Sequence, residues 1–206
     1  MSPRDFVEYS TGSEPASFWD VSLGACDTPE AKPSLAVGTM ILTPNGELPV
    51  EYLQAGDRIL TRNHGIQSII RIETQMLSDA ELRVSPALCP IMITRNALGT
   101  RLPCRDLLVA PTQRIPVRAA DVDAGRPVHL LNARELVGRT EGVFVDEIAM
   151  AAAGVEYFAL VLDQPCIIWA DGLPVESFGL RVQLRHHNAA QTSSPGAIQR
   201  PSSASG

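Results

Sequence analysis

Residues 38–61 read GTMILTPNGELPVEYLQAGDRILT, and this stretch predicts strands and tight turns in close succession. The apolar run Met40–Thr43 ends at Pro44-Asn45-Gly46, and an Asn-Gly pair favours the positive φ values of a hairpin turn. A second apolar run, Val50–Leu53, leads to Gly56-Asp57, where the aspartate side chain can accept hydrogen bonds from the backbone N–H groups of a turn. The stretch therefore predicts a domain that opens with short strands.

The rest of the chain body repeats this pattern of short apolar runs separated by turn residues. The runs are about 8–12 residues apart, which is typical of all-β domains. Further strand-like runs occur at Arg58–Thr61, Gln67–Glu73, Ala87–Thr94, Leu107–Val109, Arg114–Val117, Gly142–Ile148, Glu156–Leu162 and Cys166–Ala170. Single helical turns are expected between them at Ala97–Thr100, Ala119–Asp123 and Ala133–Leu136. The predicted fold class is all-β with short connecting helical turns.

The composition divides the chain into three parts. Residues 1–33 mix Ser, Gly, Pro and acidic residues and are expected to be a leader or short extension. Residues 34–182 carry the apolar runs and are expected to form one domain. Residues 183–206 are rich in Ser, Ala, Pro, Gln and Gly and cannot bury a core, so we expect a flexible tail there.

The overall composition is that of a soluble globular protein, with 45% hydrophobic and 19% charged residues. A net charge of −6, without any run of Lys or Arg, argues against nucleic acid as a partner. No apolar stretch reaches the about 18 residues of a membrane-spanning helix, and the N-terminus lacks the apolar core of a secretory signal. We therefore expect a location in the cytoplasm, or export without a cleaved N-terminal signal.

The four cysteines are far apart and form no CxxC pair; they are Cys26, Cys89, Cys104 and Cys166. Because a zinc site needs closely spaced ligand pairs, no metal site is expected. The sequence also lacks GxGxxG, P-loop and HExxH motifs, so no cofactor is expected. Reduced thiols are the main expectation, and a disulfide between Cys89 and Cys104 across a hairpin is the alternative.

Three segments carry a more specific pattern. The first is the opening stretch, residues 38–61, and the second is Leu102–Pro111, which reads LPCRDLLVAP. The third runs from Val155-Glu156-Tyr157-Phe158 to the DGLPVESF of residues 171–178. Together they resemble the bacterial Hint (Hedgehog/intein-type) domains over about residues 34–180. The resemblance implies a compact, horseshoe-like all-β fold from a lineage of autoprocessing, splicing-like domains.

Self-processing Hint domains use a nucleophile that attacks the carbonyl just upstream, a His that protonates the departing amide nitrogen, and a Thr or Ser that orients the bond. The nucleophile of the family lies four residues before the Gly-Thr pair, and this position is Ser34, preceded by Pro33. The motif with the helpers reads VAPTQR at Val109–Arg114, with Ala110 in place of Ser and Gln113 in place of His. Gln113 can donate a hydrogen bond, but it cannot exchange a proton near pH 7 as His does.

The closing strands carry further substitutions. Family members often have a His within a Glu-Tyr-x-His run and another after the following Asp, and the residues here are Ala159 and Pro165. Two features favour activity. Thr112 can replace the missing hydroxyl if the loop shifts, and His187-Asn188 resembles the His-Asn ending of inteins. However, Ala189 follows this pair, where splicing needs Cys, Ser or Thr.

The sequence therefore supports two functional hypotheses. In the first, the chain is a Hint domain with a degenerate active site and weak or lost self-cleavage, acting as a structural or interaction module for another protein or its own N-terminal segment. In the second, it cleaves itself at Pro33–Ser34 through an N–O acyl shift, with Ser34 as nucleophile and Thr112 and Gln113 as candidate helpers. A ligand- or metal-binding β-domain is a third class without a positive motif, and the oligomeric state stays open.

Overall fold

The computed structural model describes residues 32–117, 129–146 and 154–180. Nearly all of the expected leader, residues 1–31, lies outside these ranges. So do the expected helical turn at 119–123, Cys26, and the expected tail at 183–206 with its His-Asn pair. The first described residues, Lys32 to Ser34, lead into the first strand.

The larger sheet has seven strands and is built around one long strand, β12. The strand order is β11-β7-β8-β1-β12-β15, and β6 pairs with β12 outside this path. The strands are β1 (Leu35–Ala36), β6 (Arg71–Leu77), β7 (Ile91–Ile93), β8 (Leu107–Val109), β11 (Val143–Val145), β12 (Val155–Leu162) and β15 (Phe178–Gly179). All but one of the eight residues of β12 are buried, so this strand lies in the interior on both faces.

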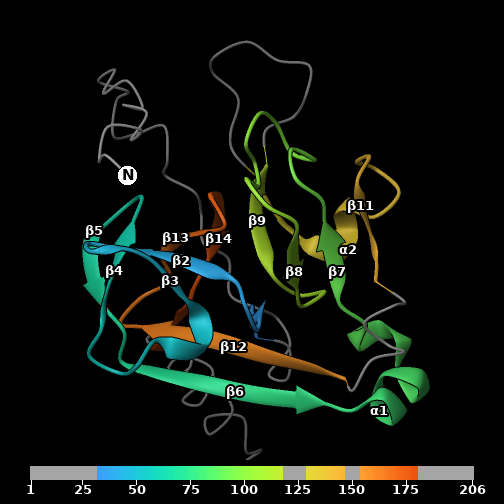
Figure 1. Cartoon of the computed structure of the whole chain (residues 1–206), viewed down its shortest axis with the longest axis horizontal. Coiled ribbons are helices and arrows are strands. Elements are labelled where there is room, and N and C mark those ends of the chain that lie inside the picture. Colours follow the sequence, from blue (N-terminus) through green and yellow to red (C-terminus); the bar gives the residue numbers. More distant parts are fainter. Residues whose placement is uncertain (1–31, 118–128, 147–153, 181–206) are drawn as a thin grey trace, which may run out of the picture.

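A second sheet has six strands in the order β3-β2-β13-β4-β5, with β14 paired to β13, and a separate pair joins β10 to β9. These strands are β2 (Met40–Thr43), β3 (Gly46–Pro49), β4 (Arg58–Thr61), β5 (Gly65–Ser68), β9 (Arg114–Val117), β10 (His129–Asn132), β13 (Ile167–Ala170) and β14 (Leu173–Glu176). In Figure 1, β6 and β12 run along the base of the molecule, and two groups of strands rise from them like the arms of a horseshoe. The expected all-β class and the horseshoe-like arrangement (Figure 1) are confirmed.

The predicted run Gln67–Glu73 is wrong as a single strand. The chain leaves β5 after Ser68 and enters β6 at Arg71. Between them, the Ile69 N–H donates to the carbonyl of Asp57 in one arm, and the Ile70 N–H donates to the carbonyl of Val161 in β12. These two residues therefore carry the chain from one sheet to the other.

The helical segments differ in part from the prediction. The helix at Ala133–Leu136 is confirmed as α2, whereas residues 97–100 form turns. An unpredicted helix, α1 (Asp79–Val84), begins with a capping box in which Ser78 and Glu81 satisfy each other's backbone N–H groups. Two short 3-10 helices, η2 (Val50–Tyr52) and η3 (Pro86–Leu88), occur where the apolar runs had favoured strands.

Several side-chain expectations can be compared with the structure. Asp57 Oδ2 accepts the Gln54 N–H at 2.8 Å, as expected for that turn. Cys89, Cys104 and Cys166 are free thiols, so the alternative Cys89–Cys104 disulfide is wrong. Within the described ranges, no helix has the length and apolar character to cross a membrane.

Candidate functional site

Ser34 directly precedes strand β1, which lies between β8 and β12 in the larger sheet. Leu35 lies opposite Val109 of β8 on one side and opposite Phe158 of β12 on the other. The carbonyl of Ser34 accepts the Ala110 N–H at 2.9 Å, so the segment that follows β8 runs directly beside it. Non-local strand pairing thus brings Ser34 next to the VAPTQR segment.

Two hydroxyl groups meet on one backbone carbonyl upstream of Ser34. Ser34 Oγ donates to the carbonyl oxygen of Lys32 at 3.0 Å, and Thr112 Oγ1 donates to the same oxygen at 3.0 Å. Pro33, between them in the chain, is buried. Two of the three residues singled out from the sequence, Ser34 and Thr112, are therefore brought together.

Gln113 is fully buried, and its side-chain amide bonds to groups other than Ser34 and Thr112. Its Nε2 donates to the backbone carbonyl of Glu176 at 2.9 Å and to that of Arg114 at 3.1 Å. These two bonds use both hydrogens of the side-chain amide. The Gln113 carbonyl accepts the Ala133 N–H at 2.8 Å, which ties the segment to α2. The side chain of Gln113 therefore joins β14 to the loop before β9.

The other substituted positions supply no proton donor or acceptor. Ala110 and Ala159 are buried methyl groups. Continuing the β1–β12 register by one residue places Ser34 opposite Ala159, so the side chain facing the hydroxyl from β12 is apolar. Pro165 packs closely against Gly179, where an added Cβ would lie 2.2 Å from Pro165 Cδ.

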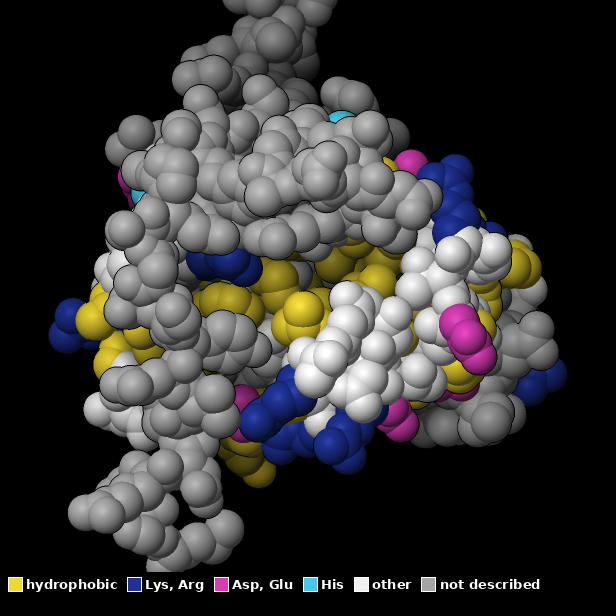
Figure 2. Space-filling model, turned by 90° about the horizontal axis from the view of Figure 1, so that it is seen from above, with side chains coloured by type: hydrophobic (Ala, Val, Ile, Leu, Met, Phe, Trp, Pro, Cys, Tyr) yellow, Lys and Arg dark blue, Asp and Glu magenta, His cyan; other side chains and the backbone are white. Residues whose placement is uncertain are grey.

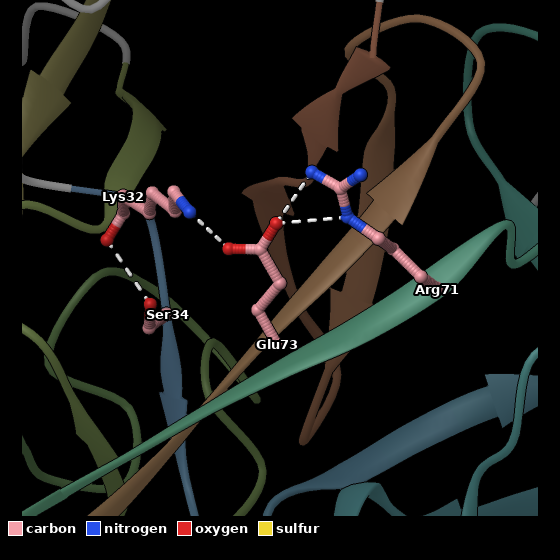
Figure 3. Close-up of polar contacts among 4 residues, drawn as sticks. All are labelled: Lys32, Ser34, Arg71 and Glu73. Carbon is pink, nitrogen blue, oxygen red and sulfur yellow. Dashed lines mark hydrogen bonds and ion pairs between the residues drawn. The ribbon is translucent and has the colours of Figure 1, made fainter. Parts of the chain in front are cut away.

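An ionic cluster that sequence reasoning missed lies on the same face of the sheet. Glu73 of β6 lies opposite Ala159, so Glu73, Ala159 and Ser34 form a row across three strands. As Figure 3 shows, the Glu73 carboxylate binds the Lys32 ammonium through Oε2 and the Arg71 guanidinium through Oε1, the latter with contacts of 2.6 and 2.8 Å. No motif points to Glu73, because only the register of β6 on β12 brings it to the site.

The electrostatics of this cluster favour an ionised carboxylate. Partial burial works to raise the pKa of Glu73, but the hydrogen bonds from Lys32 and Arg71, together with their positive charges, hold it below the ordinary glutamate value. Glu73 is therefore an anion near neutral pH, and it faces the residue two positions before Ser34.

A second ion pair joins Arg114, the residue after Gln113, to Glu176, whose backbone carbonyl accepts a hydrogen bond from Gln113. Glu176 Oε2 is 3.0 Å from Arg114 Nη1, and both side chains are largely buried. Glu176 Oε1 has no hydrogen-bond partner within the described part of the chain. Desolvation outweighs the nearby guanidinium and raises the pKa of Glu176 to about 7.

The described residues can also be compared with the requirements of a metal site and of a nucleic-acid interface. Within those ranges, no three His, Cys, Asp or Glu side chains gather where they would hold a metal ion. On the face drawn in Figure 2, hydrophobic side chains form a band, and Lys and Arg side chains stand in separate groups at its borders. The predicted absence of a nucleic-acid partner stays a prediction.

Comparison with known proteins gives one family match. The family model described as "Hint domain" matches residues 33–181, from the residue before Ser34 to the end of the closing strands. The match therefore includes the row of β-strand residues around Ser34 and the VAPTQR segment. No curated protein is similar enough to count as a match.

Solved structures with similar folds include three intein-type domains. A bacterial intein-like domain from Clostridium thermocellum has 15% identity and a TM-score of 0.45, covering 71% of this chain and 99% of that chain. The gp41-1 intein has 11% identity and a TM-score of 0.43, covering 72% and 100%. A DnaB intein from Synechocystis sp. PCC 6803 has 14% identity and a TM-score of 0.43, covering 70% and 98%.

Proposed function

The chain belongs to the Hint domain family, and from this premise we propose that it keeps the family's fold while its self-cleavage is weak or lost. In this proposal the domain serves as a structural or interaction module. Its first partner is its own N-terminal segment, which the site holds at Lys32–Ser34.

The environment of Ser34 Oγ is the observation that carries this proposal. The hydroxyl donates to a backbone carbonyl, which is not a base, and the residue opposite it is Ala159. A serine hydroxyl needs a base to become a nucleophile, and the departing amide nitrogen needs a proton donor. Each such helper contributes about 10²–10⁴ in rate, so the loss of both leaves cleavage very slow.

The neighbouring contacts support retention of the upstream segment. The backbone carbonyl of Lys32 accepts two hydrogen bonds, and the Lys32 ammonium binds Glu73. Pro33 is buried. These contacts belong to one chain, so the segment binds at a high effective concentration. A module of this kind keeps a bound segment in place instead of releasing it.

The test is the intact mass of the full chain after long incubation at neutral pH, with and without hydroxylamine. We expect one stable full-length mass. A fragment that begins at Ser34, and that disappears in Ser34→Ala, would overturn the proposal.

A variant that restores catalytic side chains tests whether their loss explains the slow cleavage. Ser34→Cys with Ala159→His supplies a stronger nucleophile and a titratable imidazole opposite it. We expect this variant to release residues 1–33 faster than Ser34→Cys alone. Equal rates for the two variants would show that the missing imidazole is not what limits cleavage.

Autoproteolysis at Pro33–Ser34 is the second candidate, and the position of Thr112 favours it. The Thr112 hydroxyl already donates to the carbonyl of Lys32, one residue before the bond to be cut. In this reaction Ser34 Oγ bonds to the Pro33 carbonyl carbon, the C–N bond breaks, and the proton moves to the Ser34 nitrogen. Water then hydrolyses the ester, which releases residues 1–33 with a new carboxylate and restores the hydroxyl. The mass experiment separates the two candidates.

A further inference from the structure

Lys32 is the only lysine in the chain, whereas the sequence contains sixteen arginines. It lies two residues before Ser34, at the point where the described chain enters the site. Its ammonium binds Glu73 and lies 5.8 Å from the centroid of the Phe178 ring of β15. A cation over an aromatic ring is attracted to the negative face of that ring.

The carboxylate that binds Lys32 is also fixed by a neighbouring arginine. Arg71 and Glu73 are two residues apart on β6, so their side chains project from the same face of the sheet. Arg71 contacts Oε1 through both Nε and Nη2, which leaves Oε2 directed at Lys32. Oε1 of Glu73 therefore binds Arg71 while Oε2 binds Lys32, and the Glu73 side chain is 26% exposed.

The side-chain ammonium and the backbone carbonyl of Lys32 bind different groups. The ammonium is held by Glu73 and Phe178, and the carbonyl oxygen is held by the hydroxyls of Ser34 and Thr112. A neutral side chain at this position would leave Glu73 Oε2 without its cation. It would also remove the ionic contact between the segment and β6.

We propose that Glu73, Arg71 and Phe178 form a subsite that selects a cationic side chain two residues upstream of Ser34. In doing so the subsite positions the backbone carbonyl of that residue to accept hydrogen bonds from the hydroxyls of Ser34 and Thr112. Glu73 is thus a positioning and specificity-determining residue, and the segment it recognises has the form cation-Pro-Ser. This inference rests on the proposed function, because it assumes that the segment stays bound.

The single lysine permits an unambiguous experiment on the full chain. Protein grown with ¹³C,¹⁵N-labelled lysine gives one ammonium signal and one backbone carbonyl ¹³C signal, both from Lys32. We expect Glu73→Gln to move the ammonium signal to the position of a free lysine and to shift the carbonyl signal. The matched control is Asp79→Asn, which removes one carboxylate from an ion pair with Arg83 on α1 and should move neither signal.

Two further variants separate positioning from a general loss of structure. Thr112→Val should shift the carbonyl signal upfield while the ammonium signal stays, because it removes only one donor to that oxygen. Arg71→Gln removes the group that orients the Glu73 carboxylate but keeps its charge, so the ammonium signal should move only part of the way towards that of a free lysine. An unchanged ammonium signal in a folded Glu73→Gln protein would overturn the subsite, as would a free-lysine signal in the wild type.

A pH titration of the wild type keeps the test valid if Glu73→Gln fails to fold. Protonation of Glu73 should move the Lys32 ammonium signal at a pH below the ordinary glutamate pKa, since the cluster lowers the pKa of this carboxyl. A signal that does not respond to acid in the folded protein contradicts the subsite.

The outcomes for subsite and function stay distinct. An intact chain with unresponsive Lys32 signals refutes the subsite alone. Cleavage at Pro33–Ser34, with signals that responded to Glu73→Gln beforehand, refutes only the loss of self-cleavage.

Discussion

Among single residues, Glu176 combines burial, an ion pair and one oxygen without a partner in the described part of the chain. Its pKa is raised to about 7 in the folded protein, because desolvation outweighs the attraction of Arg114. In the unfolded chain the pKa returns to the ordinary glutamate value of 4.5. Between these two values the folded state holds a proton that the unfolded state has lost, so stability falls as pH rises through this window.

The first prediction concerns this pH dependence. A shift from 4.5 to about 7 corresponds to a loss of at most about 3 kcal/mol of unfolding free energy. We expect Glu176→Gln to flatten the decline between pH 5 and pH 8 in urea denaturation. The exposed Glu141→Gln is the charge-matched control. Equal slopes in the wild type and Glu176→Gln would contradict the assignment.

The second prediction concerns Gln113, the residue that the resemblance to the family motif aligns with a histidine. Gln113→Ala leaves the buried carbonyl of Glu176 without its donor and opens a cavity, so we expect a loss of about 2–4 kcal/mol. Gln113→His retains one N–H that can donate to the same carbonyl and should cost clearly less. Urea denaturation of both variants is the measurement. If His destabilises as much as Ala, the hydrogen bond to Glu176 is not the main role of this side chain.

At the scale of elements, turn residues made most strands predictable. The Asn-Gly turn before β3 and the Gly-Asp turn before β4 are local features, and their conformations depend on neighbouring residues. The missed helix α1 had a local signal too, the Ser78-x-x-Glu81 capping box. It was outweighed by the β-rich pattern on both sides.

The break between β5 and β6 was not predictable from local pattern. Ile69 and Ile70 continue an apolar run, and only their partners in two different sheets separate them. The candidate site likewise depends on contacts between segments that are distant in the sequence. Ser34 and Thr112 were found through a motif, whereas Lys32 and Glu73 meet across 41 positions because of a register that no single segment encodes.

The third prediction concerns the junction that leads into β12. Gly154 has a φ of +100°, and an added Cβ would lie 2.2 Å from the carbonyl oxygen of Leu77, at the end of β6. Gly46 has a φ of +115° with nothing within 4 Å of an added Cβ, so it shares the backbone strain without the clash. We expect Gly154→Ala to destabilise by at least about 1 kcal/mol more than Gly46→Ala, measured by thermal or urea unfolding. Equal losses would mean that the β6–β12 junction yields to the extra methyl group.

At the scale of the molecule, the arms of the horseshoe are tied together by long-range contacts. Arg105 bridges Glu47 of β3 and the buried Asp171 at the β13–β14 turn, with Nη2–Oε2 and Nε–Oδ1 distances of 2.5 and 2.9 Å. Asp171 Oδ2 also accepts the Met40 N–H of β2. Burial raises the pKa of Asp171, although the Met40 N–H and Arg105 counteract part of the effect. Within the segment LPCRDLLVAP, Arg105 thus pairs with Asp171, while the neighbouring Asp106 accepts the Arg95 N–H.

The last prediction concerns the distribution of stability. Strand β12 pairs with β6 along seven residue pairs and also with β1 and β15, and it is almost wholly buried. Among the strands of the described ranges, β5 pairs only with β4, and it is largely exposed. Amides in the centre of a sheet exchange only when large parts of the structure open, whereas edge amides exchange by local fraying. In native-state hydrogen exchange we therefore expect the amides of β12 and β1 to be the slowest and those of β5 to be much faster. Equal protection would mean that the frame around Ser34 is no more stable than the edge, and the bound segment would then lack the rigid support that retention requires.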